Sequence, residues 1–282
     1  MTKAAGTAGK TADVSVLIAL YRNDNPEYFR EAMESLFNQT MLPAEIVLVL
    51  DGPVGENLEN VIRSFSGKKN LKLVRLEQNQ GLAAALNEGL KTCSFDIIIR
   101  ADSDDICLSD RIESQYRYFS ENGSTDVLGA WVHEYTEDMK TMISVRKVPE
   151  LDKAIKRKMK RRNCINHPAA AFKKTSVLKA GGYPLFRKSQ DYALWAKMAA
   201  EEYVFHNLQT VLVKMRCGAE MMKRRNIRYF YHEYRVLKFQ RRIGFLSPFD
   251  FIINIIIRFV FRIVPNWLRL GLYRLIRIEG KH

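Results

Sequence analysis

Apolar residues in the first hundred positions form short runs that alternate with amphipathic segments. The runs are rich in β-branched residues and too short for helices, so they predict buried strands at 14–20, 45–50, 71–76 and 96–100. Between them, apolar residues recur at helical spacing over 27–38, 58–65 and 82–91. Strands and helices that alternate in this way predict an α/β fold, with a mostly parallel central sheet flanked by helices.

The fourth predicted strand ends abruptly in acidic residues, because Ile97 to Ala101 is followed by Asp102-Ser103-Asp104-Asp105. Ligands of open α/β sheets bind at the carboxyl ends of strands. Side chains two positions apart on extended backbone point the same way, so Asp102 and Asp104 can share one ligand. A Mg²⁺ or Mn²⁺ ion that holds a diphosphate would relieve the repulsion among these carboxylates. The spacing equally allows a solvated acidic turn that caps the next helix.

Two other predicted strands also end near acidic residues. Asp24 follows the first strand and Asp51 ends the second. Carboxylates at these places can accept hydrogen bonds from a base or from ribose hydroxyls. Asp51-Gly52-Pro53 is also an ordinary turn sequence, but together with the acidic cluster a nucleotide site is favoured. The chain has neither G-x-G-x-x-G nor G-x-x-x-x-G-K, which disfavours dinucleotide and P-loop enzymes.

The second half is less regular, with predicted helices at 111–122, 153–162 and 192–200 and short strands at 127–132 and 169–172. The segment 153–162 is dense in lysine and arginine. It suits a solvated helix face, a diphosphate or a membrane surface.

Most of the net charge of +14 lies in residues 214–282, which carry sixteen basic and four acidic residues. A basic appendage on a nearly neutral domain predicts an anionic partner, either nucleic acid or lipid headgroups. The basic residues are interleaved with apolar runs and no nucleic-acid motif is present, so we expect no nucleic-acid partner.

The apolar part of this tail predicts a helix that lies in a membrane surface. Its longest uncharged stretch, 251–257, is far shorter than the ~20 residues of a spanning helix. One helical face is predicted to carry Ile252, Ile256, Phe259, Val260 and Ile263. A helix packed on the catalytic domain, or a dimer contact, is the alternative. Four widely spaced cysteines and the lack of a secretion signal predict a cytoplasmic location.

Several motifs occur together and in order. They are 15–23, 47–52, Asn79-Gln80-Gly81-Leu82-Ala83 with 85–87, Asp102 to Asp105, His167-Pro168 with Gly181-Gly182-Tyr183, and Gln190-Asp191-Tyr192 with Leu194-Trp195. Over roughly 13–215 the chain resembles the inverting nucleotide-sugar glycosyltransferases of family 2, which have the GT-A fold. It looks closest to bacterial members that build O-antigen, capsule or exopolysaccharide repeats.

The resemblance implies a metal-dependent hexosyltransferase, with glucose or galactose favoured, that uses a UDP-sugar and a lipid-diphosphate-linked sugar acceptor such as an undecaprenyl diphosphate sugar. It implies that Asp191 is the catalytic base and that Asp102 and Asp104 hold Mn²⁺ or Mg²⁺. Expected nucleotide-sugar contacts are Ala19, Tyr21, Asp51, Asn79, Gly81, Arg100, Asp102 and Ser103. Expected diphosphate or acceptor contacts are His167, Gln190, Arg216, Lys223 and Arg224.

Other roles stay open for some of these residues. Asp191 also suits a helix N-cap, and a lone His167 before proline suits a structural role. Many relatives carry a metal-binding histidine after the last strand, whereas Met215 to Gly218 contains none. Either the metal has fewer protein ligands here, or basic residues meet the diphosphate directly.

The expected organisation is a disordered tail at 1–12, a GT-A catalytic domain at 13–218 and a basic helical membrane-association region at 219–282. The catalytic domain divides into a nucleotide-sugar half, 13–110, and an acceptor half, 111–218. The protein is expected on the cytoplasmic face of the inner membrane, in an unknown oligomeric state. The alternatives are a binding protein without catalysis and a sugar-nucleotide nucleotidyltransferase. The second is disfavoured because 15–23 contains neither glycine nor lysine.

Overall fold

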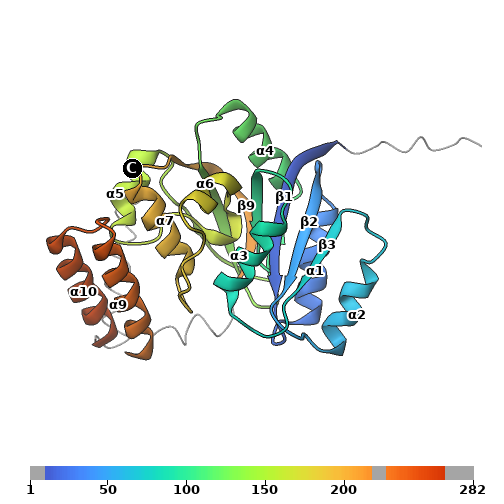
Figure 1. The fold of residues 1–282 in the computed structure, drawn as a ribbon, viewed down its shortest axis with the longest axis horizontal. Coiled ribbons are helices and arrows are strands. Elements are labelled where there is room, and N and C mark those ends of the chain that lie inside the picture. The colour runs from blue at the N-terminus through green and yellow to red at the C-terminus, as the bar shows by residue number, and fades with distance from the viewer. Residues whose placement is uncertain (1–9, 218–226, 264–282) are drawn as a thin grey trace, which may run out of the picture.

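The computed structural model describes residues 10–217 and 227–263, and its strands form one mixed sheet in the middle of the molecule (Figure 1). The order is β3-β2-β1-β4-β8-β6-β9-β5, with β7 paired to β6. The strands are β1 Thr11–Leu20, β2 Leu42–Leu50, β3 Leu71–Arg75, β4 Ile97–Ala101, β5 Ile106–Cys107, β6 Val127–Thr136, β7 Met142–Arg146, β8 Ala171–Lys173 and β9 Phe205–Cys217.

Helices cover both faces of this sheet. They are α1 Pro26–Phe37, α2 Glu56–Ser64, α3 Leu82–Thr92, α4 Arg111–Glu121, α5 Asp152–Met159, α6 Lys174–Lys179, α7 Gln190–Ala200, α9 Ile227–Arg242 and α10 Pro248–Ile263, with a 3₁₀ turn, η1, at His167–Ala169. The alternation of side chains along a strand sends Leu17 to the face covered by α3 and α7, and Ile18 to the face covered by α1, α2 and α4. The predicted α/β architecture, a central sheet flanked by helices, is thereby confirmed.

The predicted parallel arrangement holds for the first half of the sheet. β3, β2, β1 and β4 are parallel neighbours. In the second half only β6 and β9 pair in parallel, while β8 runs antiparallel to both β4 and β6. β1 begins at Thr11, so residues 11 and 12, expected in the N-terminal tail, are strand residues.

The helices α9 and α10 form a pair at the end of the molecule away from β3 and α2 (Figure 1). α9 packs on α7, and Val236 and Leu237 join the main hydrophobic core. Asn254 of α10 donates to the backbone oxygen of Lys160 at 2.8 Å, which ties the pair to the end of α5. Among the described residues no helix is both long enough and apolar enough to span a bilayer.

Candidate functional site

The ends of β1, β2 and β4 meet at one edge of the sheet, as their parallel pairing requires. The backbone N–H of Asp51 donates to the Leu20 oxygen at 2.8 Å, which joins the ends of β2 and β1. The Ser103 hydroxyl donates to Oδ2 of Asp24 at 3.0 Å, which joins the loops after β4 and β1. The acidic strand ends predicted from the sequence therefore belong to one site.

Asp51 organises the loop before α3. Its carboxylate accepts hydrogen bonds from the Asn79 side chain at 2.9 Å, from the Gln80 N–H at 2.7 Å and from the Gly81 N–H at 2.9 Å. Gly52 makes this close approach possible: its φ is +84°, and a Cβ there would lie 2.6 Å from the Asn79 nitrogen. Asp51 and the 79–81 loop thus form one rigid wall of the site.

The acidic loop after β4 concentrates unfavourable negative charge. Loss of hydration and the neighbouring Asp102 raise the pKa of Asp104 to about 6, although Asp104 remains open to solvent. Burial, and then Asp102 and Asp104, raise the pKa of Asp105 well above its ordinary value. Burial also raises the pKa of Asp24 to about 7. A cation at this edge would relieve the repulsion.

Arg100 supplies one positive charge to this acidic loop from within the protein. Its side chain is fully buried within the sheet, and its guanidinium forms an ion pair with the Asp102 carboxylate. The Arg100 backbone is fixed from behind, because Arg111 donates to its oxygen at 2.6 Å. Arg100 therefore holds Asp102 in place at the end of β4, rather than reaching into solvent.

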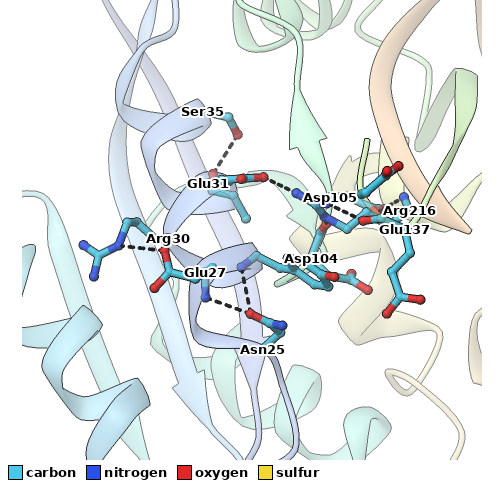
Figure 2. A network of polar contacts seen from close by, with 12 residues as sticks. Asn25, Glu27, Arg30, Glu31, Ser35, Asp104, Asp105, Glu137 and Arg216 are labelled. Atoms are coloured by element: carbon cyan, nitrogen blue, oxygen red, sulfur yellow. Dashed lines mark hydrogen bonds and ion pairs between the residues drawn. The ribbon is translucent and has the colours of Figure 1, made fainter. Parts of the chain in front are cut away.

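Arg216, at the end of β9, closes the acidic loop from the other side (Figure 2). Its backbone N–H donates to Oδ1 of Asp105 at 2.9 Å, and its Nε donates to the Asp104 oxygen at 2.7 Å. The guanidinium also donates to the Glu137 oxygen at 2.7 Å, pairs with Glu31 of α1 and lies over the Tyr28 ring. These contacts direct Arg216 to the protein around the acidic loop, whereas the sequence predicted contact with a diphosphate.

Asp191 lies in the first turn of α7, and the N-cap position belongs to Ser189. Its Oδ2 accepts a hydrogen bond from Nδ2 of Asn163 at 2.7 Å. Burial raises the pKa of Asp191, against the opposing effects of the Tyr192 N–H, Arg100 and Arg146. The alternative role of Asp191 as an N-cap is therefore wrong.

His167 lies in a buried aromatic cluster behind Arg100. Its Nε2 is 3.0 Å from the Tyr183 hydroxyl, and its ring packs edge-on against Trp195. Burial and the nearby Arg100 lower the pKa of His167 well below its ordinary value, so the ring is neutral. This geometry supports a structural role for His167.

The remaining predicted residues divide into three groups. Tyr21, whose N–H donates to Asp24 at 3.0 Å, and the partly buried Ala19 lie at the end of β1 beside the acidic loop. Gln190 is buried at the start of α7, next to Asp191. Lys223 and Arg224 lie outside the described residues.

Sequence reasoning assigned no individual role to several residues that shape the site. They are Tyr28, Glu31, Asn87, Asp105 as a buried anchor, and Asn163. Asn87 holds Tyr183 through paired backbone contacts of 2.8 and 2.9 Å, across 96 positions of sequence. Asp105 was visible in the acidic run, but its partner Arg216 is 111 positions away. Such partners follow from the fold and carry no local sequence signal.

The donor set fits a divalent cation that arrives with a phosphate ligand. Within the described residues no three acidic, histidine or cysteine side chains converge as a complete metal cage. Asp104 is accessible and Asp102 is partly so, while Asp105 is buried and used by Arg216. Mg²⁺ and Mn²⁺ are commonly held by one or two carboxylates together with substrate phosphates, and the chemistry of these two residues agrees with that pattern.

An α/β sheet of this topology, with acidic strand ends around one edge, is the architecture of the GT-A glycosyltransferases. The chain belongs to glycosyl transferase family 2, whose family model matches residues 15–180. A mannosyltransferase from Pyrobaculum calidifontis, solved with GDP-mannose and Mn²⁺, shares the fold with a TM-score of 0.60 and 16% identity. That comparison covers 99% of this chain and 79% of the mannosyltransferase.

Several bacterial glycosyltransferases are among its sequence relatives. The chain is 39% identical to an Escherichia coli UDP-Gal:α-D-GlcNAc-diphosphoundecaprenol β-1,3-galactosyltransferase, over 94% of this chain and 96% of the relative. It is 36% identical to the amylovoran biosynthesis glycosyltransferase AmsE of Erwinia amylovora, over 89% of this chain and 94% of the relative. The chain is therefore a glycosyltransferase of the group that includes enzymes of undecaprenyl-linked polysaccharide synthesis.

Proposed function

We propose that this protein is an inverting hexosyltransferase that transfers a sugar from a UDP-sugar to a hydroxyl of a lipid-diphosphate-linked sugar. The observation that carries the proposal is the convergence of Asp24, Asp51 and the acidic loop at one sheet edge, within a chain 39% identical to a UDP-galactose-dependent enzyme. Galactose is the first donor to test, with glucose next, because the two sugars differ only in one hydroxyl orientation.

The wall formed by Asp51 and the 79–81 loop is assigned to the nucleoside. The Asp51 carboxylate, which the Asn79, Gln80 and Gly81 donors hold in place, is a fixed acceptor for a base, as an acidic residue is in other nucleotide sites. Asp102 and Ser103 lie across the same edge and are assigned to the ribose and diphosphate side, and the buried Arg100 acts through its ion pair with Asp102. A divalent cation held by Asp102 and Asp104 would stabilise charge on the departing diphosphate.

Asp191 is assigned the role of base. It would take the proton of the acceptor hydroxyl as that oxygen bonds to the anomeric carbon and the bond from that carbon to the diphosphate oxygen breaks. Attack from the side opposite the leaving group inverts the anomeric configuration, by the same logic as in inverting hydrolysis. Arg100 and Arg146 oppose the effect of burial, which raises the pKa of Asp191, and so favour the ionised form that a base requires.

A lipid-linked acceptor requires the enzyme to work at a membrane surface, and the exposed face of α10 supports this. Phe249 is 72% exposed, Ile252 and Ile256 are 55% exposed, and Phe259 is 45% exposed. The opposite side of the same helix packs inward through Phe251, Asn254 and Ile255. Exposure of Ile252, Ile256 and Phe259 weighs against the alternative that this face packs on the catalytic domain.

Exposed basic residues lie on the helix that packs against α10. On the neighbouring α9, Arg235, Lys238, Arg241 and Arg242 are exposed. An amphipathic helix with cations beside it binds anionic lipid through burial of its apolar face and through electrostatic attraction to the headgroups. We therefore assign the protein to the cytoplasmic face of the inner membrane as a peripheral enzyme.

The test is a donor screen with the full-length protein. UDP release from UDP-galactose, UDP-glucose and UDP-GlcNAc is measured with a synthetic GlcNAc-diphospho-lipid acceptor, with Mn²⁺ or with EDTA. Release from one donor that requires both acceptor and metal, with the opposite anomeric configuration in the product, supports the proposal. Absence of UDP binding in the presence of Mn²⁺ contradicts it. Pyrophosphate release from a sugar phosphate and UTP would favour a nucleotidyltransferase instead.

A further inference from the structure

Asn163 makes the direct side-chain contact with the proposed base. Its Nδ2 donates to Oδ2 of Asp191 at 2.7 Å, while its Oδ1 accepts from the Ile165 N–H at 3.1 Å. The second bond fixes the orientation of the amide, because a reversed amide would place its NH₂ group against a backbone donor. The amino group of Asn163 therefore faces Asp191 for a local structural reason that does not depend on Asp191.

The loop that carries Asn163 is itself fixed. Asn207 of β9 donates to the Cys164 oxygen at 3.1 Å and to the Pro149 oxygen at 2.6 Å. Asn166 donates to the Ala130 oxygen at 2.8 Å. Cys164 and Ile165 are fully buried. Asn163 is thus a partly buried donor on a rigid loop, held at a set distance from α7.

We propose that Asn163 is a positioning residue that orients the Asp191 carboxylate and favours its ionised form. The bond occupies Oδ2, which leaves Oδ1 to receive the proton of the acceptor hydroxyl. This inference rests on the proposed function, because it takes Asp191 to be the base.

The electrostatic surroundings of Asp191 make the contribution of Asn163 measurable. The charged groups that act on this carboxylate are Arg100 from β4 and Arg146 from β7, and the Tyr192 N–H of its own helix also lowers its pKa. Burial acts in the opposite direction and has the largest effect. Tyr183, behind Arg100, is neutral because burial raises its pKa far above the physiological range. Burial and these favourable groups act on the Asp191 pKa in opposite directions, so loss of the Asn163 donor is expected to raise that pKa.

The experiment compares the pH dependence of kcat/KM for the wild-type protein, Asn163→Ala and Asn163→Gln. The base must be ionised, so activity falls on the acid side, and loss of the donor moves that acid limb to higher pH. Asn163→Ala is expected to shift the limb by about one pH unit, the size expected for a hydrogen bond to a charged group. Asn163→Gln, which keeps the amide, is expected to recover part of the shift. UDP affinity is expected to stay within about twofold of wild type in both variants, because the donor pocket is untouched.

Asn207→Ala is the matched control for a structural effect. It removes the hydrogen bonds that fix the loop at Cys164 and Pro149 without removing the donor to Asp191. We expect a lower melting temperature, and an acid limb that moves less than in Asn163→Ala because the donor to Asp191 is retained. An acid limb in Asn163→Ala that coincides with that of wild type overturns the inference. Absence of sugar transfer by the wild-type protein would instead reject the proposed function, so the two failures are distinguishable.

Discussion

The backbone N–H of Arg216 donates to Oδ1 of Asp105 at 2.9 Å, although the two residues are 111 positions apart. The contact joins the end of β9 to the acidic loop after β4. The Arg216 side chain continues the same connection to the Asp104 oxygen, to Glu137 and to Glu31 (Figure 2). One residue from the second half of the chain therefore sets the conformation of the loop that carries Asp102 and Asp104.

Substitution of Arg216 by alanine is expected to loosen that loop. The backbone contact with Asp105 survives, but the bonds to the Asp104 and Glu137 oxygens are lost. We expect the Mn²⁺ concentration for half-maximal activity to rise roughly tenfold or more, as with other residues that support metal ligands. Glu31→Gln removes only the ion pair and is expected to cost less than about threefold, since the Glu31 carboxylate is half-exposed and Arg216 keeps its bonds to the Asp104 and Glu137 backbone oxygens. Equal metal dependence in all three proteins would contradict this role.

Asp191→Asn is expected to abolish transfer while UDP binding remains. A general base contributes about 10²–10⁴-fold to the rate, and the substituted amide cannot accept the proton. The amide keeps the shape of the carboxylate, so binding of UDP measured by calorimetry should match wild type. Full activity in Asp191→Asn would reject the assignment of the base.

Asp104→Asn is expected to weaken UDP binding, which Asp191→Asn is expected to leave unchanged. Asp104 is the accessible carboxylate of the acidic loop, so its loss should weaken UDP binding in the presence of Mn²⁺ by roughly tenfold or more, whereas binding in EDTA should be little changed. Asp110→Asn, beyond the acidic loop at the start of α4, is a matched control with one fewer negative charge. An equal loss in both variants would indicate a general charge effect instead of a metal ligand.

The stability of the metal-free protein should fall as pH rises. The pKa of Asp24 is raised to about 7, so its contribution to stability is present below its unfolded pKa and is lost as pH rises through about 7. The resulting loss is on the order of a few kcal/mol. Urea unfolding at pH 5 and pH 8 in EDTA measures it. Asp24→Asn stays neutral and should reduce the difference, of which Asp104 and Asp105 retain a part. Asp13→Asn, at an exposed position of β1, should leave it unchanged.

The sequence predicted the first half of the fold well because its signals are local. The run 45–50 and the helix beginning after Asn25 are each defined by neighbouring residues, including the Asn25 cap, which accepts from the Glu27 N–H at 2.9 Å. The acidic edge was predictable for the same reason, since parallel strands place their ends together.

The second half was harder because its contacts are long-range. β7 is a partly exposed edge strand, and β9 mixes polar with apolar residues over Phe205–Cys217. Neither has the clean periodicity that identifies an element from sequence. The partners of Asp191, Asp105 and Tyr183 come from distant positions and are visible only when the fold brings them together.

The apolar face of α10 gives a direct test of membrane association. Ile252→Ser with Ile256→Ser removes two residues that are each 55% exposed, so the fold should be retained. Burial of a whole isoleucine contributes about 1.5–3 kcal/mol, and the double variant should therefore bind vesicles containing phosphatidylglycerol at least about tenfold more weakly. Met142→Ser with Ile143→Ser, exposed at 50% and 53% on the edge strand β7, is the control and should bind as wild type does. Transfer to a water-soluble short-chain acceptor should be equal in all three proteins. Binding that the α10 substitutions leave unchanged would contradict the membrane role of this face, and a change in oligomeric state alone would identify it as a contact between two copies.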